Sequence, residues 1–187
     1  MAAAAALLPF LPMLPFQVLL NNTLYDVSEI AIPLGRVDAA ELAAPQAFDL
    51  GCVRRFMLVL VPLSSVFDLI TFGVLLAVFD AVPELFRTAW FVESLATQVL
   101  VIFVIRTRGS PFASRPHPAL VATSLAVVAV AALLPYTPVA PMLGFVPIPA
   151  PLWGVLALLV AAYLAFAEAG KRAFHARWGV SPARALC

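Results

Sequence analysis

The chain has 187 residues, of which 64% are hydrophobic and 11% are charged, and its mean hydropathy is +1.04. This composition excludes a soluble domain of such length and predicts an integral membrane protein. The net charge of +1 gives no reason to expect a nucleic-acid partner. Cys52 and Cys187 stand far apart in segments predicted as cytoplasmic, so neither a structural disulfide nor a cysteine metal site is expected.

Five apolar stretches predict an all-α, multi-pass membrane bundle. They cover residues 7–33, 56–79, 86–105, 119–134 and 152–169. A helix needs roughly 17–25 residues to cross the hydrocarbon core of a bilayer. The first stretch is crowded with prolines and lacks a basic start, so we interpret it as the remains of a membrane helix and its continuation, not as a signal peptide.

The positive charges predict the orientation of the spans. Ten of the eleven Lys and Arg residues follow the first, third or fifth stretch, and only Arg87 lies on the other side. Because positive charge collects on the cytoplasmic side, we expect the polar loop 35–55 and the C-terminus to be cytoplasmic, in the plasma (inner) membrane. Lys171 and Arg172 are expected to anchor the last helix to the inner leaflet.

A candidate cation site lies in the first stretch. Asn22, Asp26 and Glu29 stand at positions i, i+4 and i+7, so a helix carries them on one face. Amide and carboxylate oxygens suit a hard cation, and nearby prolines free backbone carbonyls, as in the broken helices of transporters. Asn22 and Asp26 are therefore predicted metal ligands, with polar helix packing as the alternative. Glu29 is a weaker candidate, since it also fits a solvated charge at the inner interface.

Two more carboxylates lie inside predicted spans, Asp68 near Ser64 and Thr71, and Glu93 near Thr97. No Lys, Arg or His stands well inside a span, and a central charge costs on the order of 3 kcal/mol or more. Each acid must therefore be protonated, face water or meet a transient cation. Glu93 is predicted to be a cation ligand or proton carrier, with a protonated packing acid as the alternative. Asp68 is a weaker candidate, because Ser64, Ser65 and Thr71 would also satisfy a neutral acid.

Sequence signatures of catalysis are missing. The chain has no Gly-rich phosphate loop, no Ser-His-Asp set and no Cys/His cluster. We therefore predict neither catalytic residues nor an ATP site in this chain.

Several motifs follow one another along the chain. The main ones are Phe10-Leu-Pro-Met-Leu-Pro-Phe-Gln-Val-Leu-Leu-Asn-Asn-Thr-Leu-Tyr-Asp26, Ser64-Ser-Val-Phe-Asp-Leu-Ile-Thr-Phe72, Trp90-Phe-Val-Glu-Ser-Leu95 and Leu134-Pro-Tyr-Thr-Pro138. In this order they resemble the C-terminal membrane region of P-type cation-transporting ATPases, most closely the bacterial magnesium-translocating group. The resemblance covers essentially the whole chain.

The resemblance implies a pump with ten transmembrane helices, of which residues 1–187 supply the tail of the fifth and all of the sixth to tenth. In that family the sixth helix is partly unwound, and its Asn and Asp bind the ion; these positions correspond to Asn22 and Asp26. The eighth helix can add a carboxylate, which corresponds to Glu93. Asp68 matches a motif of the seventh helix without a ligand role. The implied cargo is Mg²⁺.

Large parts of that family's pumps are missing from this sequence. The phosphorylated aspartate, the nucleotide-binding domain and the actuator domain are absent, so the chain alone is expected neither to hydrolyse ATP nor to pump. We expect a truncated product or one half of a split magnesium pump, with the bilayer and the missing N-terminal part as partners. The alternatives are a small membrane protein that regulates an intact pump, and an oligomeric ion channel or carrier.

Overall fold

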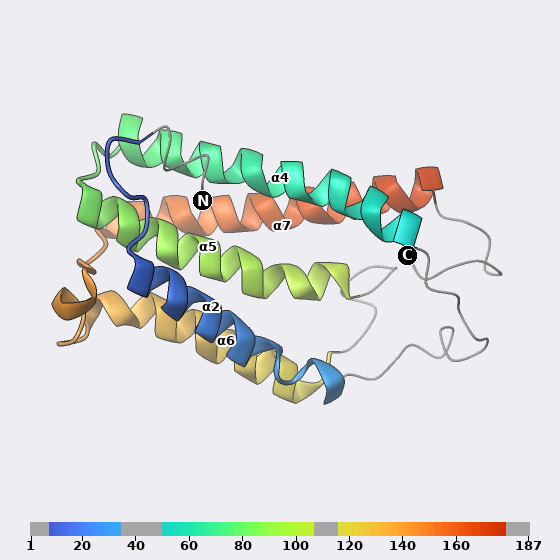
Figure 1. Ribbon diagram of the computed structural model, residues 1–187, viewed down its shortest axis with the longest axis horizontal. Coiled ribbons are helices and arrows are strands. Elements are labelled where there is room, and N and C mark those ends of the chain that lie inside the picture. Colours follow the sequence, from blue (N-terminus) through green and yellow to red (C-terminus); the bar gives the residue numbers. More distant parts are fainter. Residues whose placement is uncertain (1–7, 35–49, 107–115, 179–187) are drawn as a thin grey trace.

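The computed structural model describes residues 8–34, 50–106 and 116–178. In this part of the chain the α-helices are α2 (Pro15–Glu29), α4 (Leu50–Ala77), α5 (Pro83–Ile105), α6 (Pro118–Leu133) and α7 (Ala150–Trp178) (Figure 1). Short 3₁₀ turns lie at Ile32–Leu34, Leu134–Tyr136 and Pro141–Leu143. No strand occurs among the described residues, and the predicted all-α fold is confirmed.

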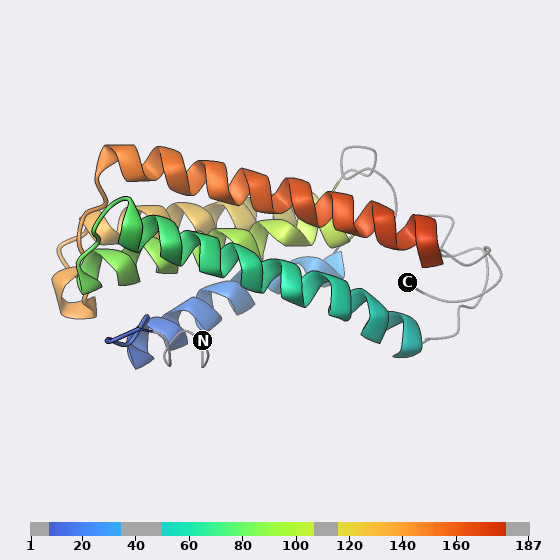
Figure 2. The same cartoon turned by 90° about the horizontal axis from the view of Figure 1, so that it is seen from above.

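Four of these helical segments are long and apolar enough to cross a membrane. They are Val53–Ala77, Pro83–Ile105, Pro118–Tyr136 and Ala150–Phe174. The chain is therefore a multi-pass membrane protein. Figure 2 shows α2 as a short helix inclined to the long α4 and α7. Its 15 residues reach about 22 Å at ~1.5 Å per residue, which is less than the hydrocarbon core of a bilayer.

The first apolar stretch contains one continuous helix. Pro15 is at the start of α2, where a missing N–H and a fixed φ cost nothing, and Pro33 lies beyond its end. No Pro or Gly stands between these two positions. The unwinding that the resemblance implies for the sixth helix therefore does not fall between Asn22 and Asp26, which belong to an unbroken helix.

The proline-rich segment before α2 packs against α5. The Nε of Arg87 donates a hydrogen bond to the Leu11 carbonyl at 2.9 Å, and the guanidinium carbon lies 5.9 Å from the centre of the Phe10 ring. The Phe10 ring meets Phe86 edge-on, with centroids 5.3 Å apart. The Leu11 carbonyl, which no helix bond satisfies, is thus paired with a side chain of α5.

Gln17 joins the start of α2 to the connection between α6 and α7. Its Oε1 accepts a hydrogen bond from the Leu14 N–H at 3.0 Å, which caps the helix. Its Nε2 donates to the Leu143 carbonyl at 3.0 Å and to the Gly144 carbonyl at 3.3 Å. Gly144 has φ +71°, the left-handed conformation that favours glycine. One buried amide therefore holds two distant segments together.

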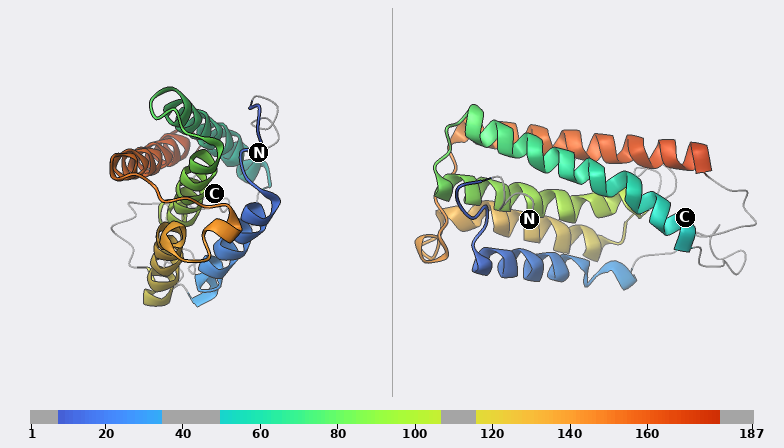
Figure 3. Two further views of the ribbon diagram at one scale, coloured as in Figure 1. Left: turned by 90° about the vertical axis from the view of Figure 1, so that its left-hand side faces the viewer. Right: turned by 45° about the horizontal axis from the view of Figure 1, so that its top comes forward.

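Helix α5 lies at the centre of the bundle. It packs against α2, α4, α6 and α7, and Figure 3 shows it between the α4–α7 pair and the α2–α6 pair. Within its most apolar stretch 67% of the residues are buried, against 22–28% in the other three spans. The side chains of α5 therefore form much of the interior of the bundle.

Helix α4 begins earlier than the sequence predicts. The helix begins at Leu50, within the segment 35–55 that the sequence predicts as polar and cytoplasmic. Residues 35–49 lie outside the described residues. Arg54 and Arg55 lie exposed on the first turns of α4. Because arginine is a good helix former, the helix can begin before the apolar stretch at little cost.

The end of α7 holds a buried cation. Lys171 is only 1% exposed; its Nζ donates to the Val104 carbonyl at 2.8 Å and lies 2.7 Å from Oε2 of Glu168. Arg172 is exposed and bonds the same carboxylate at 2.6 Å. The expected role as a lipid anchor is therefore wrong for Lys171, which binds a carbonyl in the last turn of α5, where intrahelical donors run out.

We expect Lys171→Met to destabilise the chain by roughly 2–4 kcal/mol, because it removes the donor to Val104 and one partner of Glu168. The measurement is thermal unfolding of the whole chain in detergent. Arg172→Met is the matched control and should cost no more than about 1 kcal/mol, since its ion pair is exposed. Equal losses in the two variants would show that the Lys171 contact does not hold α7 to α5.

Candidate functional site

The residues predicted on α2 lie on its outer face. Asn22 and Asp26 are exposed and Glu29 is half-buried. The buried face of α2 carries other polar side chains, because α5 and α6 pack there. No group of three or more His, Cys, Asp or Glu residues that could hold a metal ion occurs in the described part of the chain. Asn22 and Asp26 therefore offer oxygens on an uncovered face and do not form a complete metal site.

Asn21, the neighbour of a predicted ligand, faces the interior. Its Nδ2 donates to Oε1 of Gln98 on α5 at 3.2 Å, and the residue is 3% exposed. Gln17 and Ser28 are buried on the same face, and the Ser28 carbonyl accepts a hydrogen bond from Thr123 of α6 at 3.2 Å. Sequence reasoning missed this polar line, although the spacing from Gln17 through Asn21 to Ser28 is that of one helix face.

Asp68 and Glu93 are brought together. Both line a pocket of about 80 Å³ between α4, α5 and α7. The other lining residues are Ser64, Phe67, Ser94, Thr97, Gln98 and Tyr163. Glu93 is 2% exposed, whereas Asp68 is half-buried. Neither Asn22 nor Asp26 lines this pocket, so the structure divides the predicted ligands between two places.

The hydrogen bonds of Asp68 differ from those predicted. Its Oδ1 accepts a hydrogen bond from Nε1 of Trp90 at 3.3 Å. Ser64 bonds the Tyr163 hydroxyl at 2.9 Å, Ser65 donates to a backbone carbonyl of its own helix, and the buried Thr71 hydroxyl has no hydrogen-bond partner in the described part of the chain. Asp68 is therefore satisfied by an indole from α5, which only tertiary packing places there.

The hydroxyl protons near Glu93 are used by the backbone. Thr97 donates to the Glu93 carbonyl at 3.0 Å and to the Ser94 carbonyl at 2.9 Å. Ser94 donates to the Phe91 carbonyl at 3.3 Å. The Oε2 atom of Glu93 is buried and has no hydrogen-bond partner among the described residues. A buried oxygen without a donor calls for an explanation.

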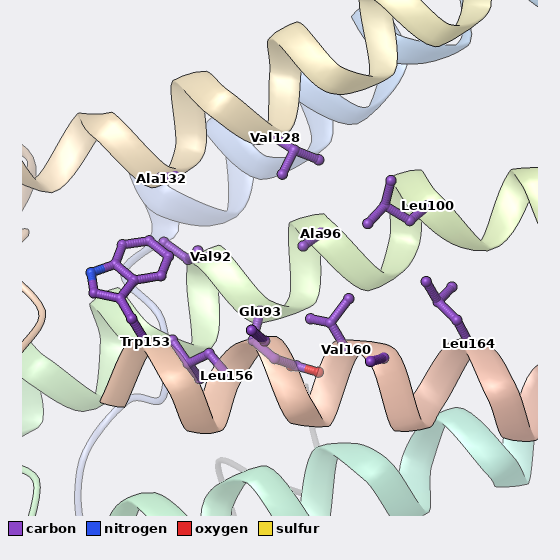
Figure 4. Close-up of a pocket in the computed structure, with 12 residues that line it drawn as sticks. Val92, Glu93, Ala96, Leu100, Val128, Ala132, Trp153, Leu156, Val160 and Leu164 are labelled. Carbon is purple, nitrogen blue, oxygen red and sulfur yellow. The ribbon is translucent and has the colours of Figure 1, made fainter. Parts of the chain in front are cut away.

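Glu93 also borders a second and larger space. A groove of about 310 Å³ lies between α5, α6 and α7, and Figure 4 shows its aliphatic lining together with Trp153. Glu93 is the single ionisable residue among those that line it. The carboxyl group thus stands at the boundary between a small polar pocket and an apolar groove.

Long apolar helices, with Asp68 and Glu93 in a pocket between them, define a polytopic helical membrane protein. The family described as "Cation transporting ATPase, C-terminus" matches residues 10–173. The chain therefore belongs to the family of cation-transporting ATPase C-terminal regions, which confirms the resemblance.

Curated relatives agree with this family. The chain is 39% identical over 181 residues to "Magnesium-transporting ATPase, P-type 1" of Salmonella typhimurium (strain 14028s / SGSC 2262). It is 39% identical over 184 residues to the protein of the same name from Escherichia coli (strain K12). Each match covers 94% of this chain and 20% of the relative. The chain thus spans about a fifth of the length of the relatives it matches, and corresponds to the membrane-embedded C-terminal portion of a pump.

The two neighbouring asparagines should respond differently to truncation. We expect Asn21→Ala to destabilise the whole chain by about 1 kcal/mol, because it removes the bond to Gln98 between two helices. Asn22→Ala should change stability by no more than about 0.5 kcal/mol, since the side chain is exposed. Thermal unfolding in detergent measures both. A larger loss for Asn22→Ala would mean that α2 is rotated relative to this structure.

Proposed function

We propose that this chain contributes to the membrane ion pathway of a magnesium-transporting P-type ATPase, and that Asn22 and Asp26 supply oxygen ligands to the transported Mg²⁺. The observation that carries the proposal is the exposure of both side chains on one face of α2, while the opposite face packs against α5 and α6. An uncovered polar face on an apolar bundle is expensive in lipid unless it meets protein or water.

The chemistry of the two side chains fits this cargo. Mg²⁺ takes oxygen ligands in octahedral geometry and keeps part of its water shell, so one or two carboxylates from the protein suffice. Asn22 and Asp26 stand one helical turn apart, which lets an amide oxygen and a carboxylate face the same ion. The remaining ligands, and the ATP-driven movement, belong to the rest of the pump, which is the proposed partner of this chain.

We also propose that the C-terminal end of α7 lies on the cytoplasmic side of the inner membrane. The start of α4, the end of α5 and the end of α7 meet at one end of the bundle (Figure 1). This end carries Arg54, Arg55, Arg106, Lys171 and Arg172. The opposite end, where α4 connects to α5 and α6 to α7, has Arg87 as its only described cation. This asymmetry is the one expected of cytoplasmic and external surfaces.

Glu93 was predicted as a ligand of the same ion. It lies on α5 and faces α4 and α7, in a pocket that does not include Asn22 or Asp26. We therefore base the proposed Mg²⁺ site on α2 alone.

In the whole pump that contains this chain, Asp26→Asn should lower Mg²⁺ uptake by at least about tenfold, because it removes a charged ligand. Uptake is measured in cells without other magnesium transporters, at equal amounts of pump in the membrane. Glu84→Gln, a matched change at an exposed acid in the first turn of α5, should leave uptake unchanged. Wild-type uptake by Asp26→Asn would refute the assignment of α2.

A further inference from the structure

We propose that the connection between α6 and α7, residues 134–149, is a lipid-binding surface that inserts into the boundary between the headgroups and acyl chains of the bilayer. Its partner is phospholipid of the leaflet at that end of the bundle. This inference involves neither Asn22 nor Asp26 and does not depend on the proposed Mg²⁺ site.

The connection has no charged side chain. Its sequence is Leu134-Pro-Tyr-Thr-Pro-Val-Ala-Pro-Met-Leu-Gly-Phe-Val-Pro-Ile-Pro149. The other connection at this end of the bundle, between α4 and α5, contains Asp80, and Glu84 follows in the first turn of α5; both acids are exposed. Because segments that join helices through water are ordinarily polar, the uncharged connection is suited to a less polar medium.

Contacts with α5 place part of the connection level with the first turns of that helix. Phe145 is buried, and its ring centroid lies 4.8 Å from that of Phe91. The Val146 N–H donates a hydrogen bond to Oγ1 of Thr88 at 3.1 Å. Thr88 and Phe91 belong to the membrane span Pro83–Ile105. The connection therefore folds back against the bundle, where Figure 1 shows it close to the end of α6.

The outer side of the connection is apolar. Met142 is 85% exposed, and Val139 and the ring of Tyr136 are exposed as well. They follow Val130 and Leu133, which are exposed on the last turns of α6. Lipid surrounds such a face of a membrane span. Since no charged residue interrupts the apolar surface between α6 and Met142, lipid is the medium that continues along it.

The backbone of the connection needs few hydrogen bonds from water. Five of its residues are prolines, which have no N–H to pair: Pro135, Pro138, Pro141, Pro147 and Pro149. Six other N–H groups donate to carbonyls of the connection itself, namely those of Thr137, Ala140, Met142, Leu143, Gly144 and Phe145. A backbone whose donors are paired or missing can leave water at low cost, as insertion among lipids requires.

An aromatic pair stands at the two ends of the connection. Nε1 of Trp153, in the first turn of α7, donates to the Tyr136 hydroxyl at 2.7 Å. That hydroxyl donates in turn to the Ile148 carbonyl at 2.8 Å. Trp and Tyr collect at the boundary between acyl chains and headgroups, because their rings are apolar and their polar atoms reach water or headgroups. Both ends of the connection therefore lie at this boundary.

The connection also holds the start of α2. Nε2 of Gln17 donates to the carbonyls of Leu143 and Gly144, which directly follow Met142. Lipid bound around Met142 therefore supports the segment to which α2 is bonded. The proposed surface thus links the bilayer to the position of a helix inside the bundle.

The test is electron paramagnetic resonance of the spin-labelled chain in phospholipid nanodiscs, with one chain per disc. Cys52 and Cys187 are replaced by Ser, and the label is attached through Met142→Cys or Val139→Cys. Collisions with oxygen, which concentrates in lipid, are compared with collisions with a nickel chelate, which stays in water. We expect the oxygen-to-nickel ratio at both positions to be several-fold higher than at Glu84→Cys, the exposed acid at the same end. It should approach the ratio at Leu133→Cys, on the exposed face of α6.

A ratio at both positions as low as that at Glu84→Cys would overturn the proposal, since the connection would then lie in water. Protection from both reagents would also overturn it, because protein would then cover the connection; the same labels in the whole pump extend this test to its other parts. If Met142→Cys does not fold, the label at position 139 still decides. The measurement uses neither Mg²⁺ nor transport, so the proposed Mg²⁺ ligands can fail while the lipid surface stands.

Discussion

The packing of four helices against α5 is the constraint on which the rest of the bundle depends. In lipid the hydrophobic effect does not draw helices together, so close packing and hydrogen bonds between helices must do so. Small side chains such as Ala89 and Ala96 are buried on α5 and let neighbours approach closely. Hydrogen bonds then link it to α2, α4 and α7, to the segment before α2 and to the connection between α6 and α7. These links are Arg87 to Leu11, Trp90 to Asp68, Gln98 to Asn21, Val104 to Lys171 and Thr88 to Val146.

This arrangement gives the acids of the bundle three different environments. Asp26 lies on an uncovered face of α2, where it can meet an ion or another part of a pump. Glu168 is neutralised by Lys171 and Arg172 at the end of α7. Asp68 and Glu93 share a pocket in which the described residues supply an indole donor but no cation. Helix packing therefore gives acids of similar chemistry different electrostatic surroundings.

Much of the fold could be predicted from local features. The apolar stretches indicate the spans because a helix must satisfy its own backbone in lipid. Pro15, Pro83 and Pro118 are at the starts of α2, α5 and α6, where proline favours a helix start. Contacts between the helices were harder to predict from the sequence. The bond of Asn21 to Gln98 and the pairing of Glu168 with Lys171 were not predicted, because both depend on which way a helix faces.

The sequence by itself determined that the chain is a multi-pass helical membrane protein and that it resembles the C-terminal region of cation-transporting ATPases. Both follow from composition and from motifs in order along the chain, which need no knowledge of contacts. Only the tertiary structure decided that Asn21 faces inward, that Trp90 donates to Asp68 and that Oε2 of Glu93 has no donor among the described residues. Neighbouring residues on a helix point about 100° apart, so a small rotation changes which of them is buried. That rotation is set by partners far away in the chain, such as Gln98 for Asn21, which local patterns do not specify.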